Sequence, residues 1–252
     1  MSADQHFDEL SSRFARKIYG STKGAIRLSV LQRDLTEALP SGPLKVLDIG
    51  AGQGHMALWL AQQGHQVTVT EPSTPMLSEA QQAFSAAGCS ARFINAAWQQ
   101  LDDHLADEQF DVVLCHAVLE WLAEPFLSLP ALKARLNPAG LLSLAFYNQD
   151  ALHYHNLLKR NFRKVSSARW AGDKGGLTPQ HPLDPRQLEA ALHDTGLAIQ
   201  QRSGIRVFHD YMPREFRQLA SADSLVEQEL LHSRHPAFMG LGRYLHWLCR
   251  AQ

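Results

Sequence analysis

The stretch Val46-Leu47-Asp48-Ile49-Gly50-Ala51-Gly52-Gln53-Gly54 decides the fold of this 252-residue chain. The apolar run from Leu44 to Ile49 predicts a buried parallel strand, which breaks into a glycine-dense turn and is followed by a helical stretch over 55–63. Glycines at the tip of a first strand let the backbone approach a ligand that a Cβ atom would repel. A second strand ends at Glu71, whose carboxylate can accept two hydrogen bonds from a ribose diol. Together, the turn and the acid predict a site for an adenosine-containing cofactor on an open α/β sheet.

The spacing of the glycines separates two kinds of adenosine-containing cofactor. Dinucleotide sites carry Gly-x-Gly-x-x-Gly, whose last spacing lets a helix N-terminus meet a pyrophosphate. Here the spacing is Gly-x-Gly-x-Gly, and Asp48 precedes it inside the strand. An acid is out of place beside a pyrophosphate but useful beside a cationic ligand without phosphate, which leaves a dehydrogenase as a distant alternative. The other alternative is an ordinary tight connection between a strand and a helix, with no ligand.

Strand-like and helix-like segments alternate along nearly the whole chain. This alternation predicts an α/β fold, a doubly wound, mainly parallel, seven-stranded Rossmann-like sheet in a single domain over residues 1–252. Residues 1–40 are expected to form an N-terminal helical cap, and the basic segment 150–182 an insertion after the fifth strand. The predicted helices span 7–18, 25–39, 55–63, 75–87, 125–136, 185–195 and 214–232, and the predicted strands span 44–49, 66–71, 91–95, 110–115, 141–147, 197–208 and 244–249.

Composition narrows the class of protein. With 45% apolar and 19% charged residues, the chain has the make-up of an ordinary globular protein. No apolar run approaches the roughly 18 residues that span a bilayer, and the first residues lack the features of a secretion signal, so we expect a cytoplasmic location and no membrane partner. Cys89, Cys115 and Cys249 lie far apart and the histidines show no metal-ligand spacing, so no metal is expected.

Basic residues are concentrated in two segments, although the formal net charge is only −1. Residues Arg13–Arg33 contain six basic side chains and no acid, and residues 151–172 contain five, all between Lys159 and Arg169, again with no acid. The second segment also holds three aromatic residues, Tyr154, Phe162 and Trp170. Cations that neutralise phosphates, with aromatic rings between them, suit splayed-out RNA bases. The alternative is two solvated helix faces whose charge is balanced by acids elsewhere.

Rarer motifs run over nearly the whole chain and carry a resemblance to a known family. They are Phe14–Arg27 (FARKIYGSTKGAIR), His116–Trp121 (HAVLEW), Phe146–Asn148 (FYN), His155-Asn156, Gly204–Tyr211 (GIRVFHDY) and Gly242–His246 (GRYLH). The glycine turn is similar to the first motif of the class I S-adenosylmethionine-dependent methyltransferases, and these other motifs resemble the tRNA 5-carboxymethoxyuridine methyltransferases. The resemblance implies an enzyme that methylates the carboxylate of 5-carboxymethoxyuridine at the tRNA wobble position to the methyl ester, with the anticodon stem-loop as its partner.

The resemblance also implies which residues hold the methionine part of the cofactor. Gly50, Ala51 and Gly52 would pass under it through backbone contacts, and Asp48 lies in the strand just before them. Arg27, on the N-terminal helix, would fold back over the site and clamp the cofactor carboxylate. A guanidinium suits this task because it can form two parallel hydrogen bonds to a carboxylate.

The nucleoside part is expected to contact a second set of residues. Glu71 would hold the ribose, although the family pattern has Asp at this position. Ala97 and Trp98, after the third strand, would meet the adenine, where a polar residue in place of Trp98 is more usual. His116, just past the fourth strand, would lie next to the methionine moiety and the methyl acceptor.

The acceptor carboxylate determines what catalysis requires. A carboxylate is already ionised at neutral pH, with a reference pKa of about 4, so no general base is needed and no catalytic residue is assigned. The protein must instead align the two reactants and exclude water. Two alternatives stay open: a methyltransferase for a small-molecule acid or quinone precursor, and an RNA-binding protein with a vestigial cofactor pocket. The candidates for orienting the acceptor share the resemblance motifs and are Tyr147, Asn148, Arg206, His209 and Tyr211.

Overall fold

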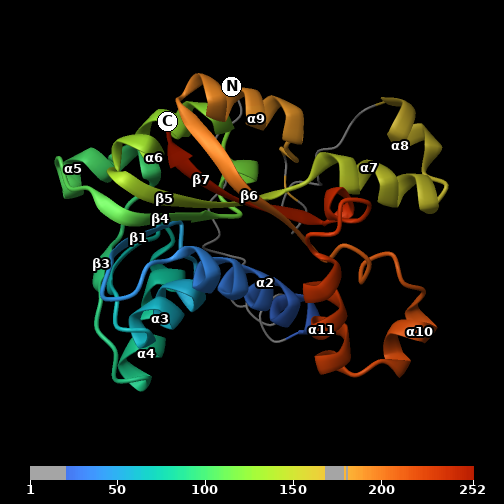
Figure 1. The fold of residues 1–252 in the computed structure, drawn as a ribbon, viewed down its shortest axis with the longest axis horizontal. Coiled ribbons are helices and arrows are strands. Elements are labelled where there is room, and N and C mark those ends of the chain that lie inside the picture. The colour runs from blue at the N-terminus through green and yellow to red at the C-terminus, as the bar shows by residue number, and fades with distance from the viewer. Residues whose placement is uncertain (1–20, 168–178, 180) are drawn as a thin grey trace.

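A seven-stranded sheet forms the centre of the molecule (Figure 1). The computed structural model describes residues 21–167, 179 and 181–252. The strand order is β3-β2-β1-β4-β5-β7-β6, and β7 runs antiparallel to both of its neighbours while the other pairs are parallel. The strands are β1 (Lys45–Ile49), β2 (Gln66–Thr70), β3 (Arg92–Ile94), β4 (Phe110–His116), β5 (Leu136–Tyr147), β6 (Leu197–Ile205) and β7 (Tyr244–Ala251).

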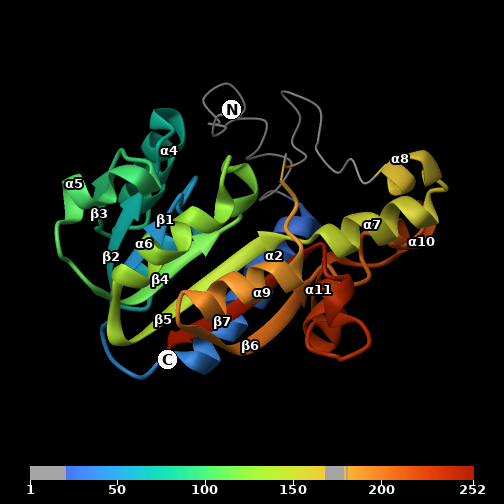
Figure 2. The same cartoon turned by 90° about the horizontal axis from the view of Figure 1, so that it is seen from above.

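Helices cover both faces of this sheet, as the doubly wound prediction requires (Figures 1 and 2). One face is covered by α2 (Thr22–Ala38), α3 (His55–Gln62) and α4 (Thr74–Ala86), with α11 (Ala222–His232) packed beside α2. The opposite face is covered by α5 (Leu101–Leu105), α6 (Leu129–Ala134) and α9 (Pro185–Asp194). Short 3-10 turns lie at Trp98–Gln100 (η1), Leu119–Trp121 (η2), Pro125–Ser128 (η3) and Met239–Leu241 (η4).

Each strand supplies both faces because successive side chains point to opposite sides of a sheet. In β1, Leu47 and Ile49 join the core under α5, α6 and α9, while Val46 joins the core under α2 and α3. In β4, Val113 joins the core under α5, α6 and α9, and Val112 joins the core under α2 and α3. Both faces of the central strands are therefore apolar, which explains why their sequences are continuous hydrophobic runs rather than alternating ones.

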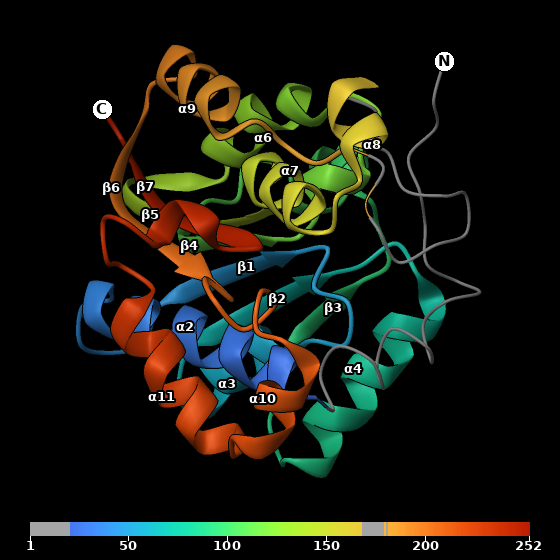
Figure 3. The same cartoon turned by 90° about the vertical axis from the view of Figure 1, so that its right-hand side faces the viewer.

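The remaining helices lie beyond the carboxyl end of β5 and alongside α2 (Figure 3). The helices α7 (Gln149–Leu158) and α8 (Phe162–Ser167) follow β5, and α10 (Arg214–Leu219) precedes α11. The described part of the predicted insertion 150–182 is therefore mostly helical. Of the predicted N-terminal cap, only α2 and the segment after it are described, and the helix predicted at 7–18 lies outside the described residues.

Three predicted boundaries are wrong, each for a local reason. The strand predicted to begin at Leu141 begins at Leu136, and the residues between them form a bulge between the pairs Phe110–Leu136 and Val112–Leu141. The helix predicted over 214–232 is interrupted because Ala220 is extended and Ser221 caps a new helix by accepting the Ser224 N–H. The strand predicted to reach Phe208 ends at Ile205, since the next residue has a left-handed backbone.

Candidate active site

An open cleft of about 620 Å³ lies where the carboxyl ends of β1, β2 and β4 meet α2. This edge of an open α/β sheet is where such folds bind ligands. The lining residues include all of the predicted cofactor-binding residues except Ala97 and Trp98, together with others that had no predicted role. They are Arg27, Leu28, Leu31, Asp48, Gly50, Ala51, Gly52, Met56, Glu71, Met76, His116, Ala117 and Trp121.

The glycine turn forms the floor of this cleft, and Gly50 is its most constrained position. Its backbone is left-handed, with φ of +64°, and a Cβ atom there would lie 2.7 Å from the Val118 Cγ2 atom. Gly52 is also left-handed, with φ of +58°, but a Cβ there would have its nearest neighbour 3.9 Å away. Glycine is therefore required by conformation at both positions and by space at Gly50.

Glu71 ties this turn to the end of β2. Its Oε2 atom accepts a hydrogen bond from the Gly52 N–H at 2.8 Å, and its Oε1 atom accepts one from the Ser73 N–H at 2.9 Å. Glu71 therefore fixes the glycine turn at the end of β2.

Asp48 lies beneath the turn as a second buried acid. Burial and the neighbouring charge of Glu71 raise the pKa of its carboxyl to about 7, although the Ala57 backbone N–H and the charge of Arg27 oppose the shift. Two carboxyls at the floor of one cleft make it favourable for a cation. An acid with such a raised pKa is a typical mark of a functional site.

Arg27 brings the compensating positive charge from α2. Its side chain lines the cleft, is only 6% exposed, and has its guanidinium carbon 5.0 Å from the centre of the Tyr244 ring. A buried guanidinium stacked on an aromatic ring is held in a fixed orientation. This placement agrees with the expectation that α2 carries Arg27 over the site.

His116 closes the cleft at the end of β4. Its Nε2 atom lies 2.8 Å from the Ser143 Oγ atom, while its Nδ1 atom is buried and has no hydrogen-bond partner among the residues that the structure describes. Burial, the nearby His246 and the charge of Arg27 together lower the pKa of His116 well below its usual value. The ring is therefore neutral at physiological pH and offers one unused nitrogen.

Ala97 and Trp98 do not line this cleft. Ala97 caps η1, where its N–H donates to the Gln100 side chain, and Trp98 packs against the core on the opposite face of the sheet. The adenine contact expected of these two residues stays a prediction. Met56 and Met76 are apolar lining residues that lie outside every motif, so the sequence did not reveal them.

A second charged group lies next to the cleft, and we call it the Asp210 cluster. Three cations surround the Asp210 carboxylate: the side chains of Lys23, Arg206 and Arg243 at 3.8, 3.4 and 4.0 Å. Burial would raise the pKa of Asp210, but the His209 hydrogen bond and these three charges outweigh it and hold that pKa well below the usual range. Arg206 has φ of +61°, a strained conformation for this residue type.

The ring of Tyr244 joins the Asp210 cluster to the cleft. Arg206 lies over this ring at 5.5 Å, and Arg27 of the cleft lies over it at 5.0 Å. Arg243 lies over the neighbouring Tyr147 ring at 5.1 Å, and the two tyrosine rings are 5.3 Å apart. The Nη1 atom of Arg243 is buried and has no hydrogen-bond partner within the described part of the chain. The Asp210 cluster therefore lies next to the cleft, and the Tyr244 ring contacts both.

Comparison with known proteins identifies the family. Residues 47–144 match the methyltransferase domain family. Over 98% of its length, the chain is 40% identical to the tRNA 5-carboxymethoxyuridine methyltransferase of Escherichia coli strain K12, covering 96% of that protein. The chain belongs to the tRNA 5-carboxymethoxyuridine methyltransferase family. A more distant relative, the ubiquinone biosynthesis O-methyltransferase of Rhizobium leguminosarum bv. trifolii, is 30% identical over 69% of the chain and 66% of that protein.

Solved structures agree with this family fold. The magnesium protoporphyrin IX methyltransferase from Synechocystis PCC 6803, with bound SAH, superposes with a TM-score of 0.63 at 17% identity, covering 98% of this chain and 96% of that one. The plantazolicin methyltransferase BamL gives a TM-score of 0.62 at 16% identity, covering 96% and 90%. The class I methyltransferase fold predicted from the sequence is therefore confirmed.

The cofactor of this methyltransferase is S-adenosylmethionine, and the cleft residues fit it. The Gly50–Gly52 cradle leaves a close approach that a Cβ would fill. Asp48 and Glu71 are buried acids, which suit a ligand that carries a sulfonium and an ammonium group, and the guanidinium of Arg27 suits a carboxylate. Among the described residues, no group of three or more His, Cys, Asp and Glu side chains could hold a metal, and no helix is long and apolar enough to cross a membrane.

The residues predicted to orient the acceptor divide into two kinds. Asn148 and Tyr211 hold the fold: the Asn148 Nδ2 group donates to the Gly240 and Gly242 carbonyls, and the Tyr211 hydroxyl donates to the Leu241 carbonyl. The backbone N–H of His209 is held by Glu229, and its ring contacts Asp210. Arg206 and Tyr147 belong to the Asp210 cluster or its aromatic support. The cluster residues that were not predicted are Lys23, Asp210 and Arg243, although each lies in one of the resemblance motifs.

The two predicted basic segments also divide. The prediction of a basic surface over Arg13–Arg33 is wrong for two members: Arg27 is buried in the cleft, and Arg33 donates to the Asp34 carboxylate and the Leu230 carbonyl. In the second segment, the side chains of Lys159, Arg160 and Arg163 are exposed on or beside α7 and α8. The other predicted members, Arg13, Arg16, Lys17, Arg169 and Trp170, lie outside the described residues.

Proposed function

We propose that this enzyme transfers a methyl group to the carboxylate of 5-carboxymethoxyuridine at the tRNA wobble position and so forms the methyl ester. The named activity of the E. coli relative supports this substrate, at 40% identity over nearly the full length. The observation that carries the proposal is the Asp210 cluster, because it presents an excess of cations directly beside the cofactor cleft. An anionic acceptor is the ligand that such a cluster favours.

The predicted cofactor residues of the cleft keep their proposed roles. Gly50, Ala51 and Gly52 give backbone contacts to the methionine part, Arg27 binds its carboxylate and Glu71 binds the ribose. When bound, S-adenosylmethionine supplies an electrophilic methyl group on a positively charged sulfur. Ala97 and Trp98 stay candidates for the adenine contact because they follow the third strand, where the family pattern places this contact.

In this proposal the cleft is the cofactor half of the site and the Asp210 cluster is its acceptor half. The charges of the acceptor half allow a carboxylate to be bound and still react. Lys23, Arg206 and Arg243 carry three positive charges, and Asp210 returns one negative charge. This balance attracts a monoanion without pairing it so strongly that its oxygens lose their nucleophilicity. The unpartnered Nη1 group of Arg243 can donate directly to the acceptor and orient it. Because the acceptor is ionised at neutral pH, no residue is required to take a proton.

The surface around α7 and α8 fits a single-stranded RNA loop. Tyr154 and Phe162 are exposed among the basic side chains of these helices. Beside them, a largely apolar groove of about 890 Å³ is lined by Tyr154, Phe208, Tyr211 and Phe238 together with four further residues. Aromatic faces next to cations are what splayed-out bases stack on, and a wobble nucleotide lies in such a loop.

The decisive experiment is mass spectrometry of wobble nucleosides from cells with and without this gene. We expect the methyl ester to disappear and the free acid to accumulate when the gene is deleted. Unchanged nucleosides would reject the proposed substrate. The same measurement separates the enzyme from an RNA-binding protein that has lost its activity.

A triple substitution of Lys159, Arg160 and Arg163 to Ala tests whether the acceptor is a tRNA or a small acid. Removing cations that neutralise phosphates weakens polyanion binding, so we expect the KM for tRNA to rise about tenfold and its salt dependence to weaken. As a control, Lys45 and Arg92 to Ala removes exposed cations from the opposite end of the sheet and should change neither value. Unchanged turnover in the triple variant would favour the small-molecule acceptor.

A further inference from the structure

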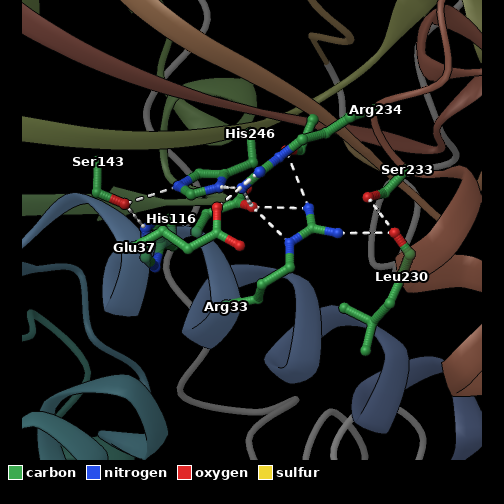
Figure 4. A network of polar contacts seen from close by, with 10 residues as sticks. Arg33, Glu37, His116, Ser143, Leu230, Ser233, Arg234 and His246 are labelled. Carbon is green, nitrogen blue, oxygen red and sulfur yellow. Dashed lines mark hydrogen bonds and ion pairs between the residues drawn. The ribbon is translucent and has the colours of Figure 1, made fainter.

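A row of polar side chains crosses the apolar face of the sheet beneath α2 (Figure 4). His116 of β4, Ser143 of β5, His246 of β7 and Ser203 of β6 lie on four neighbouring strands. His116, Ala145, His246 and Ser203 pair directly across the sheet, and Ser143 lies two residues before Ala145 on the same face. Leu114, Leu141 and Leu248 are aliphatic neighbours on this face. Burying polar groups in an apolar core is costly unless every group is paired, so such a row calls for a functional reason.

The row forms a continuous hydrogen-bonded relay from the α2 helix to the cofactor cleft. The Asp34 Oδ2 atom lies 2.7 Å from His246 Nδ1, His246 Nε2 lies 2.8 Å from Ser143 Oγ, and Ser143 Oγ lies 2.8 Å from His116 Nε2. Asp34, Ser143 and His246 are each at most 1% exposed. The relay ends at His116, whose remaining nitrogen has no partner among the described residues and whose ring lines the cleft.

The charges at the α2 end decide the direction of each hydrogen bond. Arg33 and Arg234 both donate to the Asp34 Oδ1 atom, and Arg234 also pairs with Glu37. Arg33 and Arg234 balance the charges of Asp34 and Glu37, so the group carries no net charge when His246 is neutral. A neutral His246 donates its Nδ1–H to ionised Asp34, which leaves the His246 Nε2 lone pair as an acceptor.

The remaining hydrogen positions follow from this one. The Ser143 hydroxyl donates to His246 Nε2, and the Ser143 oxygen then accepts from His116 Nε2–H. A neutral imidazole carries one proton, so His116 Nδ1 is left with a lone pair. The lowered pKa of His116 agrees with a neutral ring. The relay therefore ends in a fixed hydrogen-bond acceptor on a ring that lines the cleft.

We propose that Asp34, His246 and Ser143 are positioning residues that hold His116 in the Nε2–H tautomer, so that its Nδ1 accepts a hydrogen bond from the α-ammonium group of the methyl donor. The proposal rests on the cofactor roles proposed above. Arg27, which lines the same cleft, is the partner for the donor's carboxylate, and the ammonium group shares its carbon with that carboxylate. An ammonium group can only donate hydrogen bonds, so it requires acceptors such as this one.

The first test reads the tautomer in the free enzyme. In a protein labelled with ¹⁵N histidine, we expect His116 to carry its proton on Nε2, with its signal assigned by loss in a His116→Gln variant. Ser143→Ala should release the ring into a mixture of tautomers, and Ser143→Thr, which keeps the hydroxyl, should restore the wild-type signal. A proton on Nδ1 of His116 in the wild-type enzyme would overturn the proposal without any variant.

The second test measures ligand binding by calorimetry, without tRNA. Ser143→Ala should weaken S-adenosylhomocysteine about tenfold, as expected for a misdirected hydrogen bond to a charged group. It should leave 5′-methylthioadenosine unchanged, because that molecule lacks the amino-acid part. Equal weakening of both ligands would reject the relay and indicate a general structural defect. If the wild-type enzyme binds neither molecule, the cofactor cleft itself is misassigned, a result distinct from failure of the relay alone.

Discussion

The two halves of the site differ in the sign of their buried charge. At the ends of β1 and β2, the cofactor half holds the acids Asp48 and Glu71 under a glycine turn. At the start of β7 and the end of β6, the acceptor half holds Arg243, Arg206 and Lys23 around one acid. A cationic donor and an anionic acceptor would each meet the opposite charge. In the proposed reaction, this division of charge would align two reactants that neutralise each other.

The largest effect should come from closing the cofactor half. In Gly50→Ala, the added Cβ lies 2.7 Å from Val118 Cγ2 in a left-handed backbone, so the turn must shift. We expect binding of S-adenosylhomocysteine to fall about 100-fold or more, in line with a cost of about 3 kcal/mol for strain and clash together. Calorimetry measures this directly.

Gly64→Ala is the matched control for that change. Gly64 has φ of +88° and nothing within 4 Å of an added Cβ, so it shares the backbone penalty without the clash. Its ligand affinity should equal that of the wild type, while both variants lose some thermal stability. Equal affinity in Gly50→Ala and the wild type would show that the turn does not contact the cofactor.

The second largest effect should come from replacing Arg243 in the acceptor half of the site. Arg243→Ala removes an unpartnered buried donor and one of three cations, so methylation of tRNA should lose about 10- to 100-fold in kcat/KM, from loss of about 1.5–3 kcal/mol of charged hydrogen bonding. Binding of S-adenosylhomocysteine should not change. Arg243→Lys keeps the charge without the planar fork and should recover only part of the loss. An equal loss of tRNA methylation and of S-adenosylhomocysteine binding in Arg243→Ala would contradict the division of the site into two halves.

Arg27 lies where the two halves meet. Its replacement should have a smaller effect, which is confined to binding of the cofactor. Its replacement by Ala should weaken S-adenosylmethionine about tenfold, from loss of about 1.5–3 kcal/mol that is partly offset by relief of burial. Because Arg27 also stacks on Tyr244, the KM for tRNA serves as the internal comparison. An unchanged cofactor affinity would remove Arg27 from the cofactor half.

The same comparison explains how far sequence reasoning reached. The cofactor half is built from neighbours in sequence, a strand, its turn and the next strand, so spacing alone was enough to indicate Gly50, Asp48 and Glu71. The acceptor half brings Lys23, Arg206 and Arg243 together from α2 and the segments next to β6 and β7. No local pattern encodes that contact, and the antiparallel insertion of β7 between β5 and β6 creates it.

The side-chain relay was invisible for the same reason. In the sequence, Asp34, Ser143 and His246 are an ordinary helix acid, strand serine and strand histidine. Only the packing of α2 against the sheet brings them together. The expected adenine contact at Trp98 illustrates the converse. Its place after the third strand fits the family pattern, but apolar burial against the core competes for the same ring.

The smallest predicted effect is a dependence of cofactor affinity on pH that originates in Asp48. Burial and the charge of Glu71 raise the pKa of Asp48 to about 7 in the free enzyme. A cationic ligand favours the ionised carboxylate and lowers that pKa, so binding releases protons and becomes tighter as the pH rises. Between pH 6 and 8, the affinity for S-adenosylmethionine should increase by about fivefold, and it should level off once the carboxylate is ionised in the free enzyme.

Asp48→Asn should bind more weakly at pH 8 and lose most of this slope, since an amide does not titrate. Glu120 is a second buried acid whose pKa burial raises to about 7, so Glu120→Gln is the necessary companion variant. If the slope disappears in Glu120→Gln and persists in Asp48→Asn, the proton is released by Glu120, which contradicts the role given to Asp48. If it disappears only in Asp48→Asn, the acid beneath the glycine turn is the group that senses the cation.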